Sequence, residues 1–167
     1  MRLGWISLRP ASAAAALCAV MAIFSVTTLA AASGTKHLTA RAEGQLVFQA
    51  PCEDAPAETP LTCQTAVVTG QVTHIGRITG VLLERVDAVG SYTGSATFTT
   101  PNGDTFTTAY TGQAFPPDPS GTVSFVEWHK LVRGTGRFDE AQGTLYVEGS
   151  ASATGAITIA GTGTLDR

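Results

Sequence analysis

The densest group of chemically active side chains in the sequence is Glu127-Trp128-His129. Side chains two positions apart on a β-strand point to the same face, so Glu127 and His129 share one face and Trp128 lies on the other. A carboxylate beside an imidazole can serve as an acid–base pair in proton transfer. Both faces of this segment are half apolar, so the pattern leaves open whether the pair faces the interior or the solvent.

A third candidate is His74, which lies beside Gly76 and Arg77 at the end of a predicted strand. Either its ring bonds a turn carbonyl in a structural role, or it places a polar group at the mouth of the fold. A zinc site made by His74, Glu127 and His129 has no recognised ligand spacing, so we expect no metal and no cofactor. The sequence has no Gly-x-Ser-x-Gly or His-Glu-x-x-His motif, so whether the protein is an enzyme stays open.

Residues 1–32 have the features of a secretory signal peptide. Arg2 and Arg9 form a basic start, an uncharged Ala-rich run follows, and Ala30-Ala31-Ala32 fits a small-residue cleavage site. The alternative is a retained membrane anchor, because the run is about long enough to span a bilayer. We expect cleavage near Ala32, a secreted or periplasmic protein, and no membrane association after cleavage.

The charge balance argues against a nucleic-acid partner. The chain has a net charge of −3, and loss of Arg2 and Arg9 would take it from −3 to −5. No excess of basic residues is then present to neutralise phosphates, so we expect no binding to nucleic acid.

Cys52 and Cys63 are the two cysteines that remain after Cys18 leaves with the signal peptide. An even pair in an oxidising compartment favours a disulfide. The enclosed segment, Glu53–Thr62, is acidic and contains two prolines, which excludes a helix or a central strand. We interpret it as a solvated loop, since it lacks the Asp-x-Asp spacing of a hard-cation site.

The remaining chain alternates between apolar and polar residues with a period of two, and no long stretch keeps a helical period. Eight short strands separated by turn signals favour a closed barrel or a β-sandwich, and a closed barrel also leaves no free strand edge. We therefore predict one all-β domain, an eight-stranded antiparallel β-barrel over residues 44–167, after a flexible segment 33–43 that includes His37. The predicted strands are Gln45–Ala50, Thr65–Thr73, Arg77–Asp87, Ser91–Thr100, Asp104–Gly112, Thr122–Val132, Thr144–Ser150 and Ala156–Leu165.

One hairpin can be predicted in detail, because Pro101-Asn102-Gly103 suits a three-residue loop between two Thr-rich strands. That loop pairs Phe98 with Phe106, so that Phe98, Phe106 and Tyr110 share the buried face. Thr105 and Thr107 then belong to the opposite, exposed face. A two-residue Asn-Gly turn would instead split the phenylalanines between the faces, which the clean apolar pattern disfavours. The same alternation predicts that Leu46 and Phe48 point inward.

The segment Gly134–Gly143 fits no phosphate loop, because a strand rather than a helix follows its glycines. We expect Gly134 and Gly136 to hold backbone angles that other residues resist, and Phe138 to close one end of the barrel. Ala141 would sit where only a small side chain fits, and Gly143 would start a strand.

The pattern Gly-Thr-Gly-x-Phe-x-x-Ala-x-Gly resembles a segment of the allene oxide cyclase-like and dirigent-like barrels, which are calycin-type and of similar length. Thr73–Arg77 and Asn102-Gly103-Asp104 are similar to segments of small exported bacterial proteins of that type. The resemblance implies the fold and carries no catalytic residue across.

Three functions are compatible with such a barrel. It could bind a small apolar ligand, with Phe98, Phe106 and Tyr110 as the contact residues. It could be an isomerase or cyclase acting on a reactive lipid or terpenoid intermediate, with Glu127, His129 or His74 in the lumen. It could also be a structural or self-associating protein, such as a homo-oligomer, with a filled lumen. We expect a binding or structural role, and the volume and polarity of the lumen distinguish the three.

Overall fold

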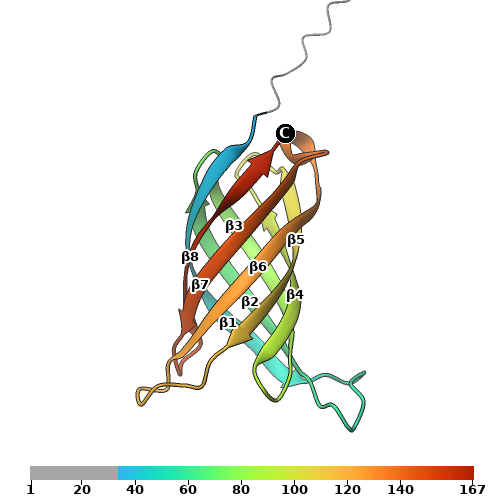
Figure 1. The fold of residues 1–167 in the computed structure, drawn as a ribbon, viewed down its shortest axis with the longest axis vertical. Helices are drawn as coiled ribbons and strands as arrows, with labels where there is room; N and C mark the ends of the chain where they lie inside the picture. The colour runs from blue at the N-terminus through green and yellow to red at the C-terminus, as the bar shows by residue number, and fades with distance from the viewer. Residues whose placement is uncertain (1–33) are drawn as a thin grey trace, which may run out of the picture. The chain divides into compact units, whose positions relative to one another are not determined.

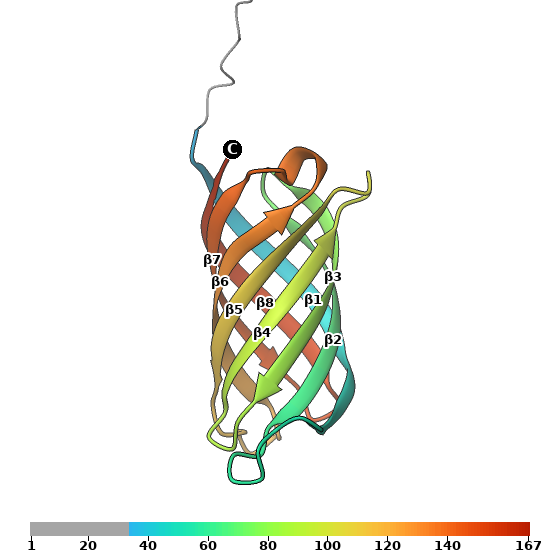
Figure 2. The same cartoon turned by 90° about the vertical axis from the view of Figure 1, so that its right-hand side faces the viewer.

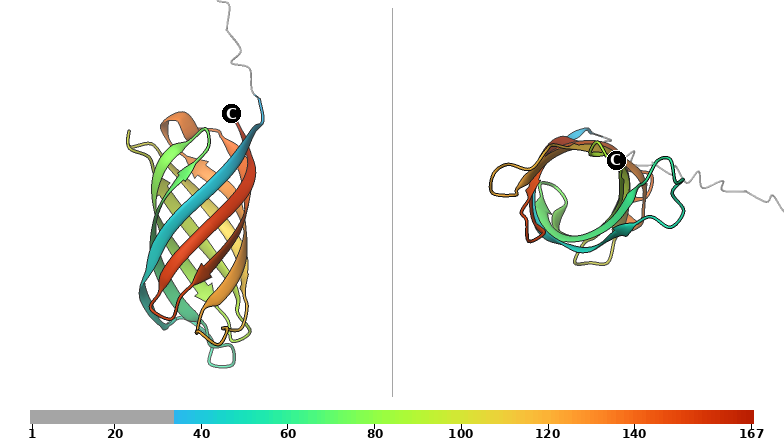
Figure 3. Two further views of the ribbon diagram at one scale, coloured as in Figure 1. Left: turned by 90° about the vertical axis from the view of Figure 1, so that its left-hand side faces the viewer. Right: turned by 90° about the horizontal axis from the view of Figure 1, so that it is seen from below.

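The alternating pattern produces eight strands that close on themselves, as the computed structural model of the chain shows for residues 34–167 (Figure 1). Every strand pairs antiparallel with its neighbours in sequence, and β1 pairs with β8 to complete the ring (Figure 3). The all-β prediction and the antiparallel barrel are confirmed. The strands are β1 (Lys36–Pro51), β2 (Thr62–Val72), β3 (Gly76–Val86), β4 (Ser91–Thr99), β5 (Thr105–Ala114), β6 (Val123–Gly134), β7 (Gln142–Ala151) and β8 (Ala156–Asp166). The predicted signal peptide lies outside the described residues.

The two ends of the barrel differ (Figures 1 and 2). One end carries the β2–β3, β4–β5 and β6–β7 connections, and the last of these contains the short 3₁₀ helix η1 (Gly136–Phe138). We call this the η1 end. The other end carries the β1–β2, β3–β4, β5–β6 and β7–β8 connections, including the loops 52–61 and 115–122, and we call it the loop end.

The segment predicted to be flexible, residues 33–43, is largely strand instead. β1 begins at Lys36, and His37 pairs with Thr164 of β8. Leu38 and Ala40 point inward and are buried, while Thr39 between them faces the solvent. The prediction was wrong because the inward residues of this stretch are mostly small, which weakens the alternation that marks a strand.

A register shift in β1 corrects the prediction for Phe48. Leu46 pairs with Ala66 of β2, and Phe48, two residues further along β1, pairs with Thr65, which is only one residue from Ala66. The extra residue in β1 reverses the faces beyond it. Leu46 therefore lies in the lumen, whereas Phe48 is 54% exposed on the outside.

The β4–β5 hairpin has the predicted register, with Phe98 opposite Phe106. Phe106 and Tyr110 are buried in the lumen, and Phe98 packs beside them. Thr107 faces outward as predicted, yet it is buried rather than exposed. The hydroxyl of Thr107 lies 3.1 Å from that of Thr97 and accepts from Arg133 Nε at 3.4 Å. These two neighbouring side chains cover Thr107.

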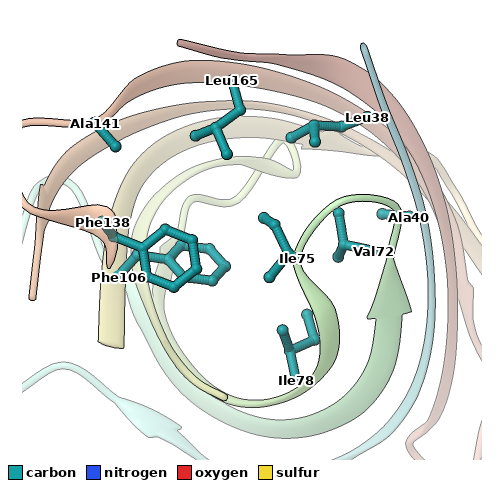
Figure 4. Packing of buried hydrophobic residues seen from close by; sticks show 9 residues of the cluster. All are labelled: Leu38, Ala40, Val72, Ile75, Ile78, Phe106, Phe138, Ala141 and Leu165. Atoms are coloured by element: carbon teal, nitrogen blue, oxygen red, sulfur yellow. The ribbon is translucent and has the colours of Figure 1, made fainter. Parts of the chain in front are cut away.

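Phe138 is fully buried and fills the lumen at the η1 end, beside Phe106 and facing Ile75 and Ile78 (Figure 4). Its ring centroid is 4.8 Å from that of Phe106. Two guanidinium groups, from Arg137 and Arg167, lie 4.9 and 5.2 Å from its ring centroid. This end of the barrel is therefore closed by an aromatic side chain that has cations on its ring.

The glycines around Phe138 serve two different purposes. Gly136 has a φ of +55°, and a Cβ there would also collide with the Asp104 carboxylate. Gly134 does not have a positive φ, so the prediction of an unusual backbone angle is wrong for this residue. A Cβ at Gly134 would instead collide with the backbone and side chain of Phe138. Ala141 is buried, and Gly143 lies one residue inside β7, which begins at Gln142.

Candidate functional site

The Glu127–His129 pair faces the lumen, which resolves the orientation that the sequence left open. Both residues are buried, at 2% and 5% exposure, while Trp128 between them is 54% exposed outside the barrel. His129 Nε2 lies 2.8 Å from Glu127 Oε2. A carboxylate and an imidazole in direct contact away from water can share and exchange a proton.

Strand β5 fixes the histidine ring from its other side. Thr108 Oγ1 lies 2.9 Å from His129 Nδ1. The ring of Tyr110, which is opposite His129 in the β5–β6 ladder, stacks on the imidazole at a centroid distance of 4.4 Å. With both nitrogens bonded and one face covered, the imidazole has a single orientation. The hydroxyl of Thr108 can accept from or donate to Nδ1, so it suits either charge state of the ring.

A second carboxyl group, from Glu84 on β3, joins the pair through two tyrosines. Tyr92 donates to Glu127 Oε1 at 3.0 Å, and Tyr110 donates to Glu84 Oε1 at 3.0 Å. The two tyrosine rings meet edge to face, with centroids 6.3 Å apart. We call this group the polar layer, and its members are Glu84, Tyr92, Thr108, Tyr110, Glu127 and His129.

Burial governs the titration of the polar layer. Loss of hydration, together with the nearby charge of Glu127, raises the pKa of Glu84 to about 7, although the bond from Tyr110 opposes this. Loss of hydration and the two carboxylates also raise the pKa of Tyr92 and of Tyr110. Both phenols therefore stay protonated near neutral pH and act as hydrogen-bond donors.

The lumen contains two spaces, and Glu127 contributes to the walls of both. The cavity at the η1 end has a volume of about 70 Å³ and is lined almost wholly by apolar side chains such as Val72, Phe98 and Phe106. The chamber at the loop end has a volume of about 330 Å³. Its walls include Glu84, Tyr92, Phe125 and Ile157, and exposed residues such as Gln49 place its mouth among the loops. We call these spaces the η1-end cavity and the loop-end chamber.

The residues predicted to contact a ligand are divided between the η1-end cavity and the polar layer. Phe98 and Phe106 line the η1-end cavity, and Tyr110 belongs to the polar layer. His74 does not join Glu127 and His129, because it is exposed in the β2–β3 turn with a φ of 62°. Within residues 34–167, no three His, Cys, Asp or Glu side chains are arranged to hold a metal ion.

Sequence reasoning missed Glu84, Tyr92 and Thr108. Each lies on an inward position of its strand, so the alternation could have placed them in the lumen. Their contact with Glu127 and His129 depends on the barrel's closure, because Tyr92 is 35 residues from Glu127. Period-two alternation says which face a side chain takes, and not which distant side chain it meets.

The Cys52–Cys63 disulfide is confirmed and closes the β1–β2 loop at the loop end. Arg85 forms a paired contact with Asp54 of this loop, with both nitrogen–oxygen distances at 2.9 Å. The loop is thus attached to the barrel at its neck and again at β3.

Comparison of the chain with protein-family models, with curated proteins and with solved structures finds no match. No helix in residues 34–167 is long and apolar enough to cross a membrane.

Proposed function

We propose that the protein binds a small, mostly apolar molecule in the loop-end chamber, with one polar group of that molecule bound to the polar layer. The observation that carries this is a mostly apolar space of about 330 Å³ that reaches the surface at one end and ends on hydrogen-bonding groups at the other. Ligand sites typically have volumes of about 300–1,000 Å³, apolar walls and a few convergent polar groups.

The size of the two spaces supports the loop-end chamber over the η1-end cavity. A cavity of about 70 Å³ holds only a molecule of a few atoms, and Phe138 fills the lumen beyond it. The binding site proposed here therefore differs from the Phe98–Phe106 surface expected from the sequence.

We also propose that the chain belongs with the allene oxide cyclase-like and dirigent-like barrels and acts outside the cytoplasm. The sequential strand order and the Phe138 closure of the Gly134–Gly143 segment support the first part. The Cys52–Cys63 disulfide supports the second, because such bonds persist in oxidising compartments.

A neutral fluorescent probe, N-phenyl-1-naphthylamine, tests chamber binding. Ala114 lines the chamber near the end of β5, whereas Ala109 of the same strand is exposed on the outside. We expect the wild type and Ala109→Phe to enhance the probe's fluorescence equally, and Ala114→Phe to reduce its affinity at least tenfold. Equal affinity in the two variants would place the probe elsewhere and overturn the proposal.

A second candidate function is proton transfer on a bound carbonyl compound, and the Glu127–His129 contact favours it. Glu127 would take a proton from the carbon beside the carbonyl and return it at the same or another carbon. Exchange of deuterium from D₂O into 4-phenyl-2-butanone, followed by NMR, tests this. Exchange no faster than with Glu127→Gln would reject it.

A further inference from the structure

Glu84 differs from Glu127 in what surrounds its carboxyl group. Both oxygens of Glu127 are occupied, since Oε1 accepts from Tyr92 and Oε2 contacts His129. Glu84 accepts from Tyr110 at Oε1 alone. In the part of the chain that the structure describes, none of the ion pairs includes Glu84. Glu84 thus lacks a basic partner among these residues, whereas Glu127 contacts the imidazole of His129.

The carboxyl group of Glu84, which has no cationic partner within residues 34–167, lies in the wall of the loop-end chamber. Glu84 lines the chamber together with the rings of Tyr92 and Phe125 and the aliphatic side chains of Leu82 and Ile157. Its neighbour on β2 is Gln64, which is neutral and lines the same space. A charge in such surroundings is costly unless a partner of opposite charge accompanies it.

We propose that the loop-end chamber selects small apolar amines, with the ammonium group bound to Glu84 and the hydrocarbon part against the apolar wall. This rests on the proposed function, because it names the ligand class for the same chamber. An ammonium donates to Glu84 Oε2, which accepts from no donor among residues 34–167, and aromatic rings beside it favour a cation further. A bare metal ion fits less well, because hard cations require six or more oxygen ligands.

The protonation of Glu84 gives this binding a pH dependence. The ionisable groups that face it are Glu127 from β6, Tyr110 from β5 and Tyr92 from β4. Burial and the charge of Glu127 raise its pKa to about 7, so at pH 5.5 the group is mostly neutral and at pH 8 mostly ionised. An ammonium binds the ionised form, so affinity for an amine increases as the pH rises from 5.5 to 8.

Three probes with one carbon skeleton isolate the contribution of the charge: 3-phenylpropylamine, 3-phenyl-1-propanol and 3-phenylpropanoate. Calorimetric titration at pH 8 is expected to give at least tenfold tighter binding of the amine than of the alcohol, and the weakest binding for the carboxylate. At pH 5.5 the preference for the amine is expected to shrink to less than threefold.

Two variants each remove one negative charge, one inside the chamber and one on the outside of the barrel. Glu84→Gln keeps the shape of the side chain in the chamber, and Glu43→Gln changes an exposed residue on the outside of β1. We expect Glu84→Gln to abolish the preference for the amine over the alcohol at pH 8. Glu43→Gln is expected to behave as the wild type.

The outcomes separate this inference from the proposed function. Equal affinity of the wild type for the amine and the alcohol would overturn the selection for amines and leave chamber binding intact. A preference for the amine that persists in Glu84→Gln would also overturn it, because the charge would then act elsewhere. Failure of all three probes to bind the folded wild type would overturn both.

Discussion

Glu84 stays neutral more readily in the folded barrel than in water, because burial and Glu127 raise its pKa from 4.5 to about 7. Between these two pH values the folded state binds more protons than the unfolded state, so the free energy of unfolding falls as the pH rises. The whole effect amounts to at most about 3 kcal/mol. We expect Glu84→Gln to lack this decline, measured by urea unfolding at pH 4.5 and 7.5. Parallel pH profiles of the variant and the wild type would contradict this account, and Glu43→Gln serves as the control.

Phe138 is the side chain whose removal should cost the most at the η1 end. It is fully buried against Phe106, and truncation would leave a cavity that the backbone around it cannot easily close. We expect Phe138→Ala to lower the free energy of unfolding by about 3–5 kcal/mol in urea titrations. Phe115→Ala, at a residue 47% exposed in the β5–β6 loop, should stay within about 0.5 kcal/mol. Similar losses for both variants would mean that Phe138 does not close the barrel.

The candidate site could be predicted in part at this scale. Alternation placed Glu127 and His129 on one face, but it could not choose the lumen, because Trp128 and its neighbours make the other face equally apolar. The structure shows why an apolar Trp128 can lie outside, since it packs against Tyr146 of β7 at a centroid distance of 5.5 Å. Contacts between strands, and not the pattern within one strand, decided the orientation.

At the scale of elements, local signals predicted the β4–β5 hairpin and failed for β1. A three-residue loop determines which residues pair, so Phe98 and Phe106 could be matched from the sequence. β1 depends on partners far away in the chain, β2 and β8, and contains a register shift between Leu46 and Phe48. A shift of one residue leaves no mark in the alternation on either side of it, so Phe48 was placed on the wrong face.

The β1–β2 connection is the element whose order depends most on a covalent bond. Cys52 and Cys63 join its ends across 11 positions, and its acidic, proline-containing sequence forms no strand. We expect the double variant Cys52→Ala/Cys63→Ala to lose about 3 kcal/mol of unfolding free energy, mainly because its unfolded chain is less constrained. Thiol titration of the unreduced wild type should find neither cysteine free. Two reactive thiols in that titration would contradict the bond.

On the scale of the whole molecule, the barrel leaves every strand paired on both sides, and the chamber exists only because the ring is complete. The ring closes where β1 meets β8, and ten residue pairs between Lys36–Leu165 and Gln45–Ala156 form that seam. The loop-end chamber and the stability of the barrel therefore both depend on a strand whose first half the sequence pattern did not reveal.

Removal of the first half of β1 tests this dependence. We expect a chain of residues 44–167 to lose cooperative thermal unfolding, measured by circular dichroism, while a chain of residues 34–167 keeps it. The shorter chain would lack buried Leu38, worth about 2–5 kcal/mol by itself. It would also expose the backbone of β8 from Thr158 to Leu165 along the seam. Such losses rival the total of about 5–15 kcal/mol that stabilises a typical domain. If both chains instead melted cooperatively at the same temperature, residues 36–43 would be dispensable and the barrel would close without them.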